Sequence, residues 1–455
     1  MSSRSSEGLA ARAAAADVLL RVERDGARAG PLLAVAERGL RDPRDRALLH
    51  ETVLGVLRRL RSIDGALAAA GTRPVAQLDE RVRAALRVGA HAVLYLDRIP
   101  DFAAVDSAVE VAKRGAGVRA AGYVNAVLRR IAARRGELLP PPPRPGNVDE
   151  LAAHHDHPTW WVARRVERLG WERTVRLLAA DNRPAPTVVR ANLLRGTAAE
   201  LGALLSAEGI ETEPSPWVPD ALRVVSGSPQ RTRAFAEGRA YIQDEAAQLV
   251  AGLLAARPGS LVIDVCAAPG GKCVQLACDP AVAPTIVACD RSWTRLRRLT
   301  DNVRRLGAPR VFPVVADGER HPPPIARPAD AVLVDAPCTA TGTLRRHPEI
   351  RWRLAPEDPA RAAERQGRLL ARAAEVVAPG GRLVYAVCSL EEEEGEDVAR
   401  RWAAAHPDFS VDREMVERVP GAARGWVGPD GALRTDPGDA GLDGFFAVAW
   451  VRAAR

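Results

Sequence analysis

The segment that most constrains the fold is Leu261–Lys272, which reads LVIDVCAAPGGK. Its apolar start predicts a short buried strand, and Pro269, Gly270 and Gly271 predict a tight turn that leads into a helix. Beyond Tyr241 the chain continues to alternate strand-length apolar runs with helical patterns, and further strands are expected at 285–290, 311–317, 331–337, 382–389 and 445–450. The alternation predicts an α/β domain built on a parallel sheet.

The carboxyl ends of parallel strands meet at one edge of such a sheet, where ligands bind. Asp290 ends the second expected strand and suits the ribose hydroxyls of an adenosine, and Asp317 ends the third and suits an adenine amino group. A single Asp in such a place more often caps the next helix, but two in register after a glycine turn favour a ligand. The turn is neither G-x-G-x-x-G nor a P-loop, so S-adenosylmethionine is favoured over a nicotinamide cofactor.

The first part of the chain has a different pattern. Residues 9 to about 136 show only helical periodicity, as in Asp45–Arg59, where Leu49, Val53 and Val56 share one face. Four consecutive prolines at 140–143 then interrupt the helical pattern. We expect four parts: a helical domain at 1–136, a Pro-rich linker at 137–150, a small α+β subdomain at 151–237, and a catalytic α/β domain at 238–455.

The net charge of +8 is concentrated at one end. Residues 1–136 hold 24 basic and 15 acidic side chains, a net +9, and the other 319 hold 41 and 42, a net −1. Only Lys113 and Lys272 are lysines, and so strong an arginine bias reflects a GC-rich code as readily as a polyanion partner. The uneven distribution still predicts that the N-terminal domain contacts nucleic acid.

No apolar run of about 18 residues predicts a membrane span, and the N-terminus lacks a signal-like segment. All six cysteines lie between Cys266 and Cys388, which argues against a disulfide framework and for a reducing cytoplasm. Their spacing suits no familiar metal module, so no metal is expected. Cys273, Cys278 and Cys289 are expected in the core, whereas Cys338 and Cys388 follow the fourth and fifth strands and face the ligand edge.

The motifs DVCAAPGGK, DAPC and VCS, in this order, resemble those of the Fmu/Sun family of RNA 5-methylcytosine methyltransferases. The likeness extends to YIQDEAAQLV before the first motif, RRHPEIRW after the second and DGFFAV near the C-terminus, and the helical N-terminus is similar to the antitermination factor NusB. The implied fold is an all-α NusB-like bundle, a small α+β subdomain and a Rossmann-like S-adenosylmethionine-dependent methyltransferase domain.

The resemblance also implies roles for individual residues. Cys388 matches the nucleophile and Cys338 the second cysteine, which helps release the product, while Asp335 and Lys272 would hold the base. The implied cofactor pocket consists of Cys266, Ala267, Ala268, Pro269, Gly270, Gly271, Lys272, Asp290, Asp317 and Asp335. Arg345, Arg346, Arg351 and Trp352 follow the substrate loop and are candidates for RNA contact.

Three positions depart from the family pattern: Val387 replaces a threonine, Ala340 a glycine and Gly395 an asparagine. These departures put the reaction rate and the geometry of the two cysteine loops in question. They remove neither of the two thiols and none of the acids expected to bind the cofactor. Two polar runs have simpler interpretations. His154–His157 is expected to be a solvated linker, and Glu391–Glu394 a solvated helix start, although this acidic run could also order the nucleophile loop.

The expected function is therefore that of a monomeric RNA (cytosine-C5)-methyltransferase acting on an unpaired cytosine of 16S ribosomal RNA. Cytosine 967 is the family's usual target and is carried over by analogy. Two alternatives remain open: the same chemistry on transfer RNA or another RNA, and a non-catalytic, NusB-like RNA-binding factor.

Overall fold

The computed structural model describes residues 8–454, which form two compact units. Unit 1 contains the chain up to Pro184 together with the later segment Leu344–Leu354, and unit 2 contains Ala185–Thr343 and the chain from Ala355 onward. The boundary at Pro184 falls inside the segment 151–237, so residues 151–184 group with unit 1 and residues 185–237 with unit 2. The four-part division expected from the sequence stays a proposal.

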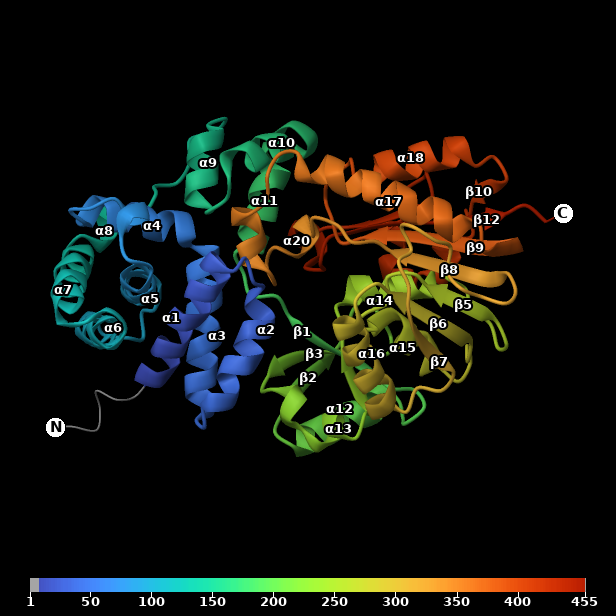
Figure 1. Ribbon diagram of the computed structural model, residues 1–455, viewed down its shortest axis with the longest axis horizontal. Coiled ribbons are helices and arrows are strands. Elements are labelled where there is room, and N and C mark those ends of the chain that lie inside the picture. Colours follow the sequence, from blue (N-terminus) through green and yellow to red (C-terminus); the bar gives the residue numbers. More distant parts are fainter. Residues whose placement is uncertain (1–7, 455) are drawn as a thin grey trace. The chain divides into compact units, whose positions relative to one another are not determined.

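Unit 1 is helical throughout its described residues (Figure 1). Its α-helices are α1 (Leu9–Arg24), α2 (Ala29–Ala36), α3 (Pro43–Arg58), α4 (Leu60–Ala70), α5 (Glu80–Tyr95), α6 (Asp101–Ala116), α7 (Val118–Ala133), α8 (Arg135–Leu138), α9 (Val148–His154), α10 (Thr159–Leu169) and α11 (Trp171–Asp181). The prolines at 140–143 lie between α8 and α9 in irregular backbone, because proline cannot continue a helix.

Helix α5 lies at the centre of this bundle, because twelve of its sixteen residues are buried. Gly89 explains how closely α7 approaches it, since a Cβ at Gly89 would meet Leu128 Cδ1 at 2.4 Å. In α3, Leu49, Val53 and Val56 are fully buried, which confirms the face expected from their spacing. Helix α3 begins with Pro43 at its first turn and Asp42 as its cap, whose side chain accepts from the Arg44 N–H.

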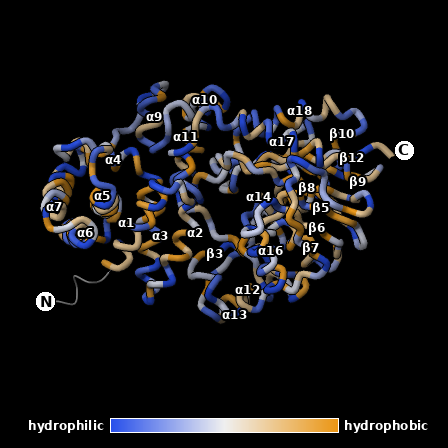
Figure 2. Tube along the Cα trace, viewed as in Figure 1, coloured by the Kyte–Doolittle hydropathy of each residue, from blue (hydrophilic) through white to orange (hydrophobic). Residues whose placement is uncertain are grey.

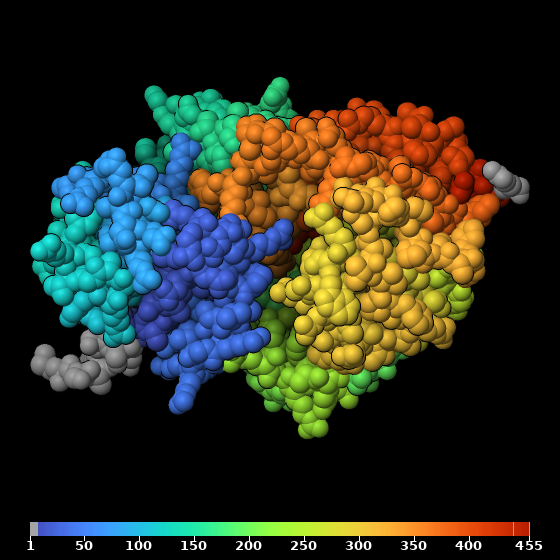
Figure 3. Space-filling view, in the orientation of Figure 1, coloured from blue at the N-terminus to red at the C-terminus, as the bar shows by residue number. Residues whose placement is uncertain are grey.

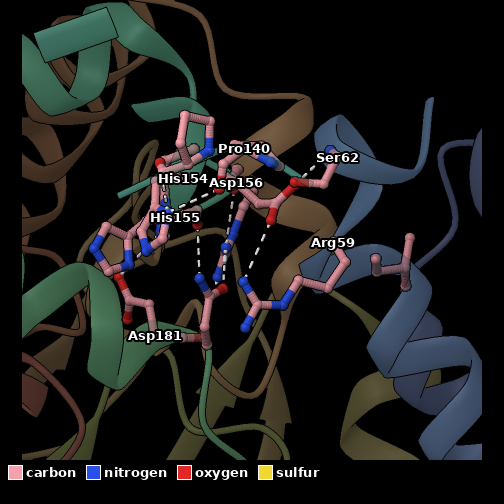
Figure 4. Close-up of polar contacts among 12 residues, drawn as sticks. Arg59, Ser62, Pro140, His154, His155, Asp156 and Asp181 are labelled. Carbon is pink, nitrogen blue, oxygen red and sulfur yellow. Dashed lines mark hydrogen bonds and ion pairs between the residues drawn. The ribbon is translucent and has the colours of Figure 1, made fainter. Parts of the chain in front are cut away.

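A buried polar cluster joins four separate segments of unit 1 (Figure 4). Asp156 is its centre: its side chain accepts from the Ser62 N–H at 2.7 Å and lies 3.4 Å from the Arg59 guanidinium. Arg351 belongs to the segment Leu344–Leu354 and donates to the Asp156 carbonyl at 3.1 Å and to Asn182 Oδ1 at 2.8 Å. We call Arg59, Ser62, Asp156, Asn182 and Arg351 the Asp156 cluster.

The expectation that His154–His157 is a solvated linker is therefore wrong. The side chains of Asp156 and His157 are 0% exposed, and His157 stacks on Trp161 with ring centroids 5.5 Å apart. Burial lowers the pKa of His157 well below its ordinary value, so its imidazole is neutral. Local sequence could not reveal this burial, because Ser62 and Arg351, which contact Asp156, lie 94 and 195 positions away from it in the chain.

Unit 2 contains two sheets. The smaller has the strand order β2-β3-β1-β4 and is antiparallel. Its strands are β1 (Thr187–Ala191), β2 (Glu211–Pro214), β3 (Ala221–Ser226) and β4 (Ala240–Ile242), and helices α12 (Ala198–Ala207) and α13 (Arg233–Ala236) accompany them. In Figure 3 this subdomain is the green part of unit 2, and the yellow surface contains α16 (Trp293–Leu306).

The larger sheet has the order β10-β12-β9-β8-β5-β6-β7, with β11 paired to β12. Strands β5 (Leu261–Asp264), β6 (Thr285–Asp290), β7 (Val311–Val315), β8 (Ala329–Asp335) and β9 (Val377–Val387) are parallel. Strands β10 (Phe409–Val411), β11 (Ala432–Thr435) and β12 (Phe445–Arg452) are antiparallel additions. The other helices are α14 (Glu245–Gly252), α15 (Gly271–Ala277), α17 (Asp358–Ala374), α18 (Glu396–Ala405), α19 (Met415–Arg418) and α20 (Pro437–Ala440).

The strand order places the switch of direction between β5 and β8, because the chain builds β6 and β7 on one side of β5 and then β8 and β9 on the other. A crevice at the carboxyl ends of the strands is expected at this point. Apolar residues concentrate along these central strands (Figure 2). Among the described residues, no helix is long and apolar enough to cross a bilayer.

The α/β fold, the helical N-terminus and the α+β subdomain are confirmed, although the type of sheet and several strand ends differ; β8 and β9, for example, end at Asp335 and Val387 rather than at residues 337 and 389. Strand β7 ends at Val315 rather than at residue 317, because the Asp317 side chain accepts from the Glu319 N–H and starts a turn. The sheet is also mixed rather than purely parallel, since β12 returns antiparallel to β9.

Candidate functional site

The turn after β5 brings backbone close to the carboxyl edge of the sheet. Gly270 has φ +106°, and a Cβ there would meet Leu299 Cγ at 3.0 Å, so the turn requires glycine on both counts. Helix α15 begins at Gly271, directly after this turn. The predicted segment Cys266–Lys272 thus runs from the end of β5 into the first turn of a helix, as a ligand-binding turn does in this class of fold.

A first pocket beside this turn contains both predicted adenosine acids. It encloses about 420 Å³, part of it open to solvent, and its lining includes Cys266, Asp290, Asp317, Gly318 and Glu319. Asp290 is 2% exposed, and its Oδ1 accepts from the Ser292 N–H at 2.9 Å. Its Oδ2 lies 3.2 Å from an Arg295 Nη1 but has no hydrogen bond of good geometry, so it is available to a hydroxyl donor.

Asp317 is more exposed to solvent than Asp290. Its side chain is 37% exposed, and one oxygen is engaged by the Glu319 N–H at 3.1 Å. Gly318 packs so tightly that a Cβ would meet Val265 Cγ1 at 2.6 Å. Sequence reasoning missed Gly318 and Glu319 as lining residues, although both follow Asp317 directly and the DGE tripeptide after a strand could have signalled them.

A second pocket continues from the same turn toward β8. Its lining includes Tyr241, Gln243, Asp264, Lys272 and Asp335. Asp264 was not predicted as a site residue, yet it is 2% exposed and its Oδ1 has no hydrogen-bond partner. Burial and the nearby Asp335 carboxylate raise the pKa of Asp264 to about 7. This oxygen is therefore available to a donor that enters the pocket.

Lys272 and Asp335 form an ion pair in this pocket, with 2.5 Å between Nζ and Oδ2. Burial disfavours the Lys272 ammonium, but the charges of Asp335 and Asp264 outweigh it, and the pKa of Lys272 is raised. Lys272 is therefore a permanent cation at neutral pH. Asp335 is 30% exposed, so part of its carboxylate faces the pocket.

The two predicted catalytic thiols lie side by side. Cys338 follows β8, Cys388 follows β9, and their Sγ atoms are 3.4 Å apart. The hydrogen bond to Cys388, burial, and the nearby negative charges raise the pKa of Cys338 well above its ordinary value. Cys338 is therefore protonated at neutral pH, and its S–H can donate to the sulfur of Cys388.

Backbone contacts hold the two thiol loops against each other. The Gly342 N–H donates to the Cys388 carbonyl at 3.1 Å, and the Gly444 N–H donates to the Gly342 carbonyl at 2.8 Å. A Cβ at Gly342 would stand 2.0 Å from the Gly444 carbonyl oxygen, so this crossing requires glycine. The DGFFAV motif that contains Gly444 thus has a structural reason to accompany the thiol motifs.

The three departures from the family pattern have different structural consequences. Val387 is fully buried in β9 opposite Phe446. Ala340 has φ +60°, a left-handed conformation that favours the family's glycine and strains an alanine. At Gly395 a Cβ would meet Phe446 Cγ at 3.0 Å, so glycine fits the space that the aromatic ring leaves.

The acidic run Glu391–Glu394 is mostly not the solvated helix start that we expected. Glu391 and Glu394 are 1% and 0% exposed, Glu392 is exposed, and α18 begins only at Glu396. The alternative, that the run orders the nucleophile loop, agrees with the contacts of Glu394: it accepts from the Thr339 N–H at 2.9 Å and the Ser389 hydroxyl at 2.7 Å. These residues directly follow the two thiols.

The four residues predicted to contact RNA belong to the segment Leu344–Leu354 of unit 1. Arg345 and Arg351 are only 4% and 1% exposed, which argues against direct RNA contact by their guanidinium groups. Trp352 is half-buried, and its Nε1 donates to the Leu57 carbonyl at 2.6 Å. RNA contact by these residues stays a prediction, and the structure gives Arg351 and Trp352 internal partners that sequence could not reveal.

Cys266, Cys273, Cys278 and Cys289 have no part in the thiol pair. Cys273, Cys278 and Cys289 are buried, which confirms their expected place in the core. Burial raises the pKa of Cys273 and of Cys289, so both stay protonated and unreactive. Within residues 8–454 no group of three or more His, Cys, Asp or Glu side chains is arranged to hold a metal ion.

Three family models match this chain, one for each of its main parts. The family model of the 16S rRNA methyltransferases RsmB/F matches residues 251–451, that of the NusB family residues 9–133, and that of the RsmF/B-like ferredoxin-like domain residues 157–230. The solved structure of PH0851 superimposes with a TM-score of 0.83 at 27% identity, covering 97% of this chain and 98% of that one.

Two curated relatives align over almost their whole length. The ribosomal RNA small subunit methyltransferase B of Vibrio cholerae is 34% identical over 446 residues, which is 96% of each chain. The probable ribosomal RNA small subunit methyltransferase B of Bacillus subtilis is 32% identical over 438 residues, covering 95% of this chain and 96% of the relative.

Proposed function

The chain belongs to the RsmB/F family of 16S ribosomal RNA methyltransferases, and from this premise we propose that it methylates carbon-5 of a cytosine in 16S ribosomal RNA through a covalent bond to Cys388. By analogy with the family the target is cytosine 967. The observation that carries the proposal is the thiol pair: Cys388 and Cys338 lie 3.4 Å apart at the ends of adjacent strands, in the same unit as the Lys272–Asp335 pair and both pockets.

The residues of the two pockets fit S-adenosylmethionine. Asp290 keeps a buried oxygen without a hydrogen bond, which suits a ribose hydroxyl, and Asp317 has an exposed carboxylate near it for the adenine. Asp264 keeps a second such oxygen, which would attract a cationic group of the cofactor. When bound, the cofactor would supply an electrophilic methyl group.

The chemistry needs a nucleophile because carbon-5 of cytosine is too weak to take a methyl group unaided. The Cys388 thiolate would add to carbon-6, which makes carbon-5 enamine-like. The Lys272–Asp335 pair would hold the ring nitrogen and the exocyclic amine and balance the charge that addition places on the ring. Cys338, which keeps its proton, would donate its S–H to the sulfur of Cys388.

The experiment is incubation of the protein with tritiated S-adenosylmethionine and separate RNA pools from cells that lack the enzyme. Label at carbon-5 of cytosine in 16S RNA supports the proposal. Label only in transfer RNA would show that transfer RNA, not 16S RNA, is the substrate. Binding of RNA without any label would favour a non-catalytic RNA-binding factor. Cys388→Ala is expected to abolish turnover, and Cys338→Ala to trap a covalent protein–RNA adduct. A fully active Cys388→Ala protein would refute the assignment.

We also propose that the NusB-like region binds RNA phosphates, as its net charge of +9 over residues 1–136 suggests. Arg38 and Arg41, which precede α3, and Arg44 in its first turn are all exposed. Changing all three to glutamine should weaken RNA binding and lower the slope of log K against log salt by about 0.7 for each lost phosphate contact with single-stranded RNA. An unchanged affinity and slope would rule out this group as a phosphate-binding surface.

A further inference from the structure

Glu394 lies between the two thiol loops with all of its acceptor capacity directed inward. Its Oε2 accepts from the Thr339 N–H and from Gln366 Nε2, each at 2.9 Å. Its Oε1 accepts from the Ser389 hydroxyl at 2.7 Å and from the Thr339 hydroxyl. Thr339 follows Cys338 directly and Ser389 follows Cys388 directly, so one carboxylate binds the immediate neighbours of both thiols.

The rest of the pocket fixes Glu394 in place. Gln366 of α17 is 0% exposed and also donates to the Pro337 carbonyl at 3.1 Å. The Tyr385 hydroxyl of β9 donates to Gln366 Oε1 at 3.0 Å and lies against the Glu394 carbonyl. We call Thr339, Gln366, Tyr385, Ser389 and Glu394 the Glu394 cluster. Because its members come from α17, β9 and both thiol loops, movement of either loop would break hydrogen bonds.

We propose that Glu394 is a positioning residue, an acceptor-only buried carboxylate that keeps the Cys338 loop against the Cys388 loop so that product release can follow methyl transfer. The inference rests on the proposed covalent function and assigns a role that the thiol motifs alone do not.

The chemistry of the four donors selects a carboxylate. Two N–H groups and two hydroxyls point at Glu394, and a carboxylate has two oxygens that accept all of them. A glutamine of the same shape could keep its oxygen toward the two N–H groups, but its NH₂ would then face the two hydroxyls, which would have to accept from it instead of donating. The two hydroxyl protons would lose their shared acceptor and the negative charge beside Cys338 would be removed, so the contact between the two loops would weaken.

The release step explains why the second thiol must stay close. After methyl transfer, the carbon-5 proton passes to water, and its electron pair reforms the C5–C6 double bond. The sulfur of Cys388 leaves carbon-6 with the electrons of the S–C bond, and the S–H of Cys338 donates a hydrogen bond to the departing thiolate. The negative charge of Glu394 is one of the causes that raise the pKa of Cys338 and keep this proton on it.

The test uses the full-length protein, tritiated S-adenosylmethionine and a transcribed 16S RNA fragment that contains the target cytosine. Glu394→Gln should lower kcat at least tenfold, leave the KM values for RNA and cofactor within twofold, and accumulate a covalent adduct on denaturing gels as Cys338→Ala does. Glu392→Gln is the matched control, because this glutamate belongs to the same run but is exposed, and it should behave as wild type.

Each outcome decides the inference. Turnover within twofold of wild type in Glu394→Gln would overturn it, and so would loss of turnover without adduct, because a merely structural role would disturb addition as well as release. If wild type makes no 5-methylcytosine and Cys338→Ala traps nothing, the proposed function itself has failed.

A milder variant guards against misfolding of Glu394→Gln. Thr339→Val removes one hydroxyl donor but keeps the Thr339 N–H that also binds Glu394. It should show the same signature at a smaller size, with about a two- to fivefold lower kcat, unchanged KM values and a measurable adduct. An adduct level equal to wild type would contradict the inference even if Glu394→Gln could not be purified.

Discussion

The Asp156 cluster of unit 1 and the Glu394 cluster of unit 2 are both built around a buried acid, yet their partners differ in kind. Asp156 lies beside the charged Arg59, and its backbone carbonyl accepts from the charged Arg351. Glu394 accepts only from neutral donors. Burial raises the pKa of both acids, and in each case hydrogen bonds oppose the shift.

The difference separates a cluster that holds segments of unit 1 together from one that lies beside the proposed catalytic thiols. The Asp156 cluster gathers residues from positions 59 to 351, and its hydrogen bonds and ion pair tie together separate segments of unit 1, so its loss should appear first in stability. The Glu394 cluster contains the residues that follow both thiols, so its loss should appear first in turnover. Matched variants in the two clusters can break or refine this division.

The largest effect on stability is expected for Arg351→Met. The change leaves the Asp156 carbonyl, the Asp181 carbonyl and Asn182 Oδ1 without their buried donor, and removal of one partner from a buried charged network costs about 3–5 kcal/mol. Urea unfolding of the full chain should show the loss in the transition that belongs to unit 1, while kcat of the folded protein stays within twofold.

Arg353→Met is the control on the same segment. Arg353 also donates to backbone carbonyls, those of Val22, Gly26 and Ala27, but it is exposed, so water can replace it and the loss should be about 1 kcal/mol. An equal loss of unfolding free energy in both variants would mean that burial does not explain the contribution of Arg351 to stability.

A smaller effect, on binding, is expected at Asp264, a third buried acid that differs from both centres because one of its oxygens has no partner. Its pKa is raised to about 7 by burial and by Asp335, with Lys272 opposing and Asp290 adding to the shift. Asp264 is therefore neutral below pH 7 and negative above it. Its attraction for a cationic group of S-adenosylmethionine is present above pH 7 and is lost as the pH falls.

The expected result is a dissociation constant that rises up to about tenfold per pH unit below 7, which is about 1.4 kcal/mol for each unit. Calorimetric titration of cofactor between pH 5.5 and 8 measures it, with proton release on binding in the lower range. Asp264→Asn should bind more weakly with a flat profile; a slope that survives in Asp264→Asn would assign the titration to another group.

The smallest effect is expected from two left-handed residues, Asp156 with φ +55° and Ala340 with φ +60°. An aspartate tolerates this conformation, and here its side chain also bonds the Ser62 N–H, whereas an alanine gains nothing from it. Ala340→Gly should therefore stabilise unit 2 by about 0.5–1 kcal/mol with turnover preserved, and Asp156→Gly should destabilise unit 1. The denaturant midpoints of the two variants should move in opposite directions. A shift in the same direction would contradict the different roles given to these two left-handed residues.

Patterns that repeat locally were enough to predict much of the molecule. The period of Leu49, Val53 and Val56 predicted a buried helical face, and the glycine turn after Leu261 predicted the strand-to-helix turn on which the ligand edge is built. Cys338 and Cys388 were paired from the rule that parallel strands end at one edge, and their sulfurs lie 3.4 Å apart. Each inference used residues close in sequence or a rule of sheet topology.

The failures share one cause. His154–His157 and Glu391–Glu394 are strings of polar residues, and polarity alone predicts exposure. Whether a polar side chain is buried depends on donors that reach it from elsewhere, such as Arg351 for the carbonyl of Asp156 or Gln366 for Glu394. Arg345 and Arg351 were proposed to contact RNA because they follow the substrate loop; both are buried, and their contact with RNA stays a prediction.

The sequence by itself therefore determined the class of fold, the family and the proximity of the two thiols, because periodicity and short motifs depend on neighbouring residues. Only the tertiary structure decided which polar residues are buried and which of them lie beside the proposed catalytic thiols. The physical reason is that burying a charge is unfavourable unless partners compensate it, and those partners are brought together by folding from positions that no local pattern connects.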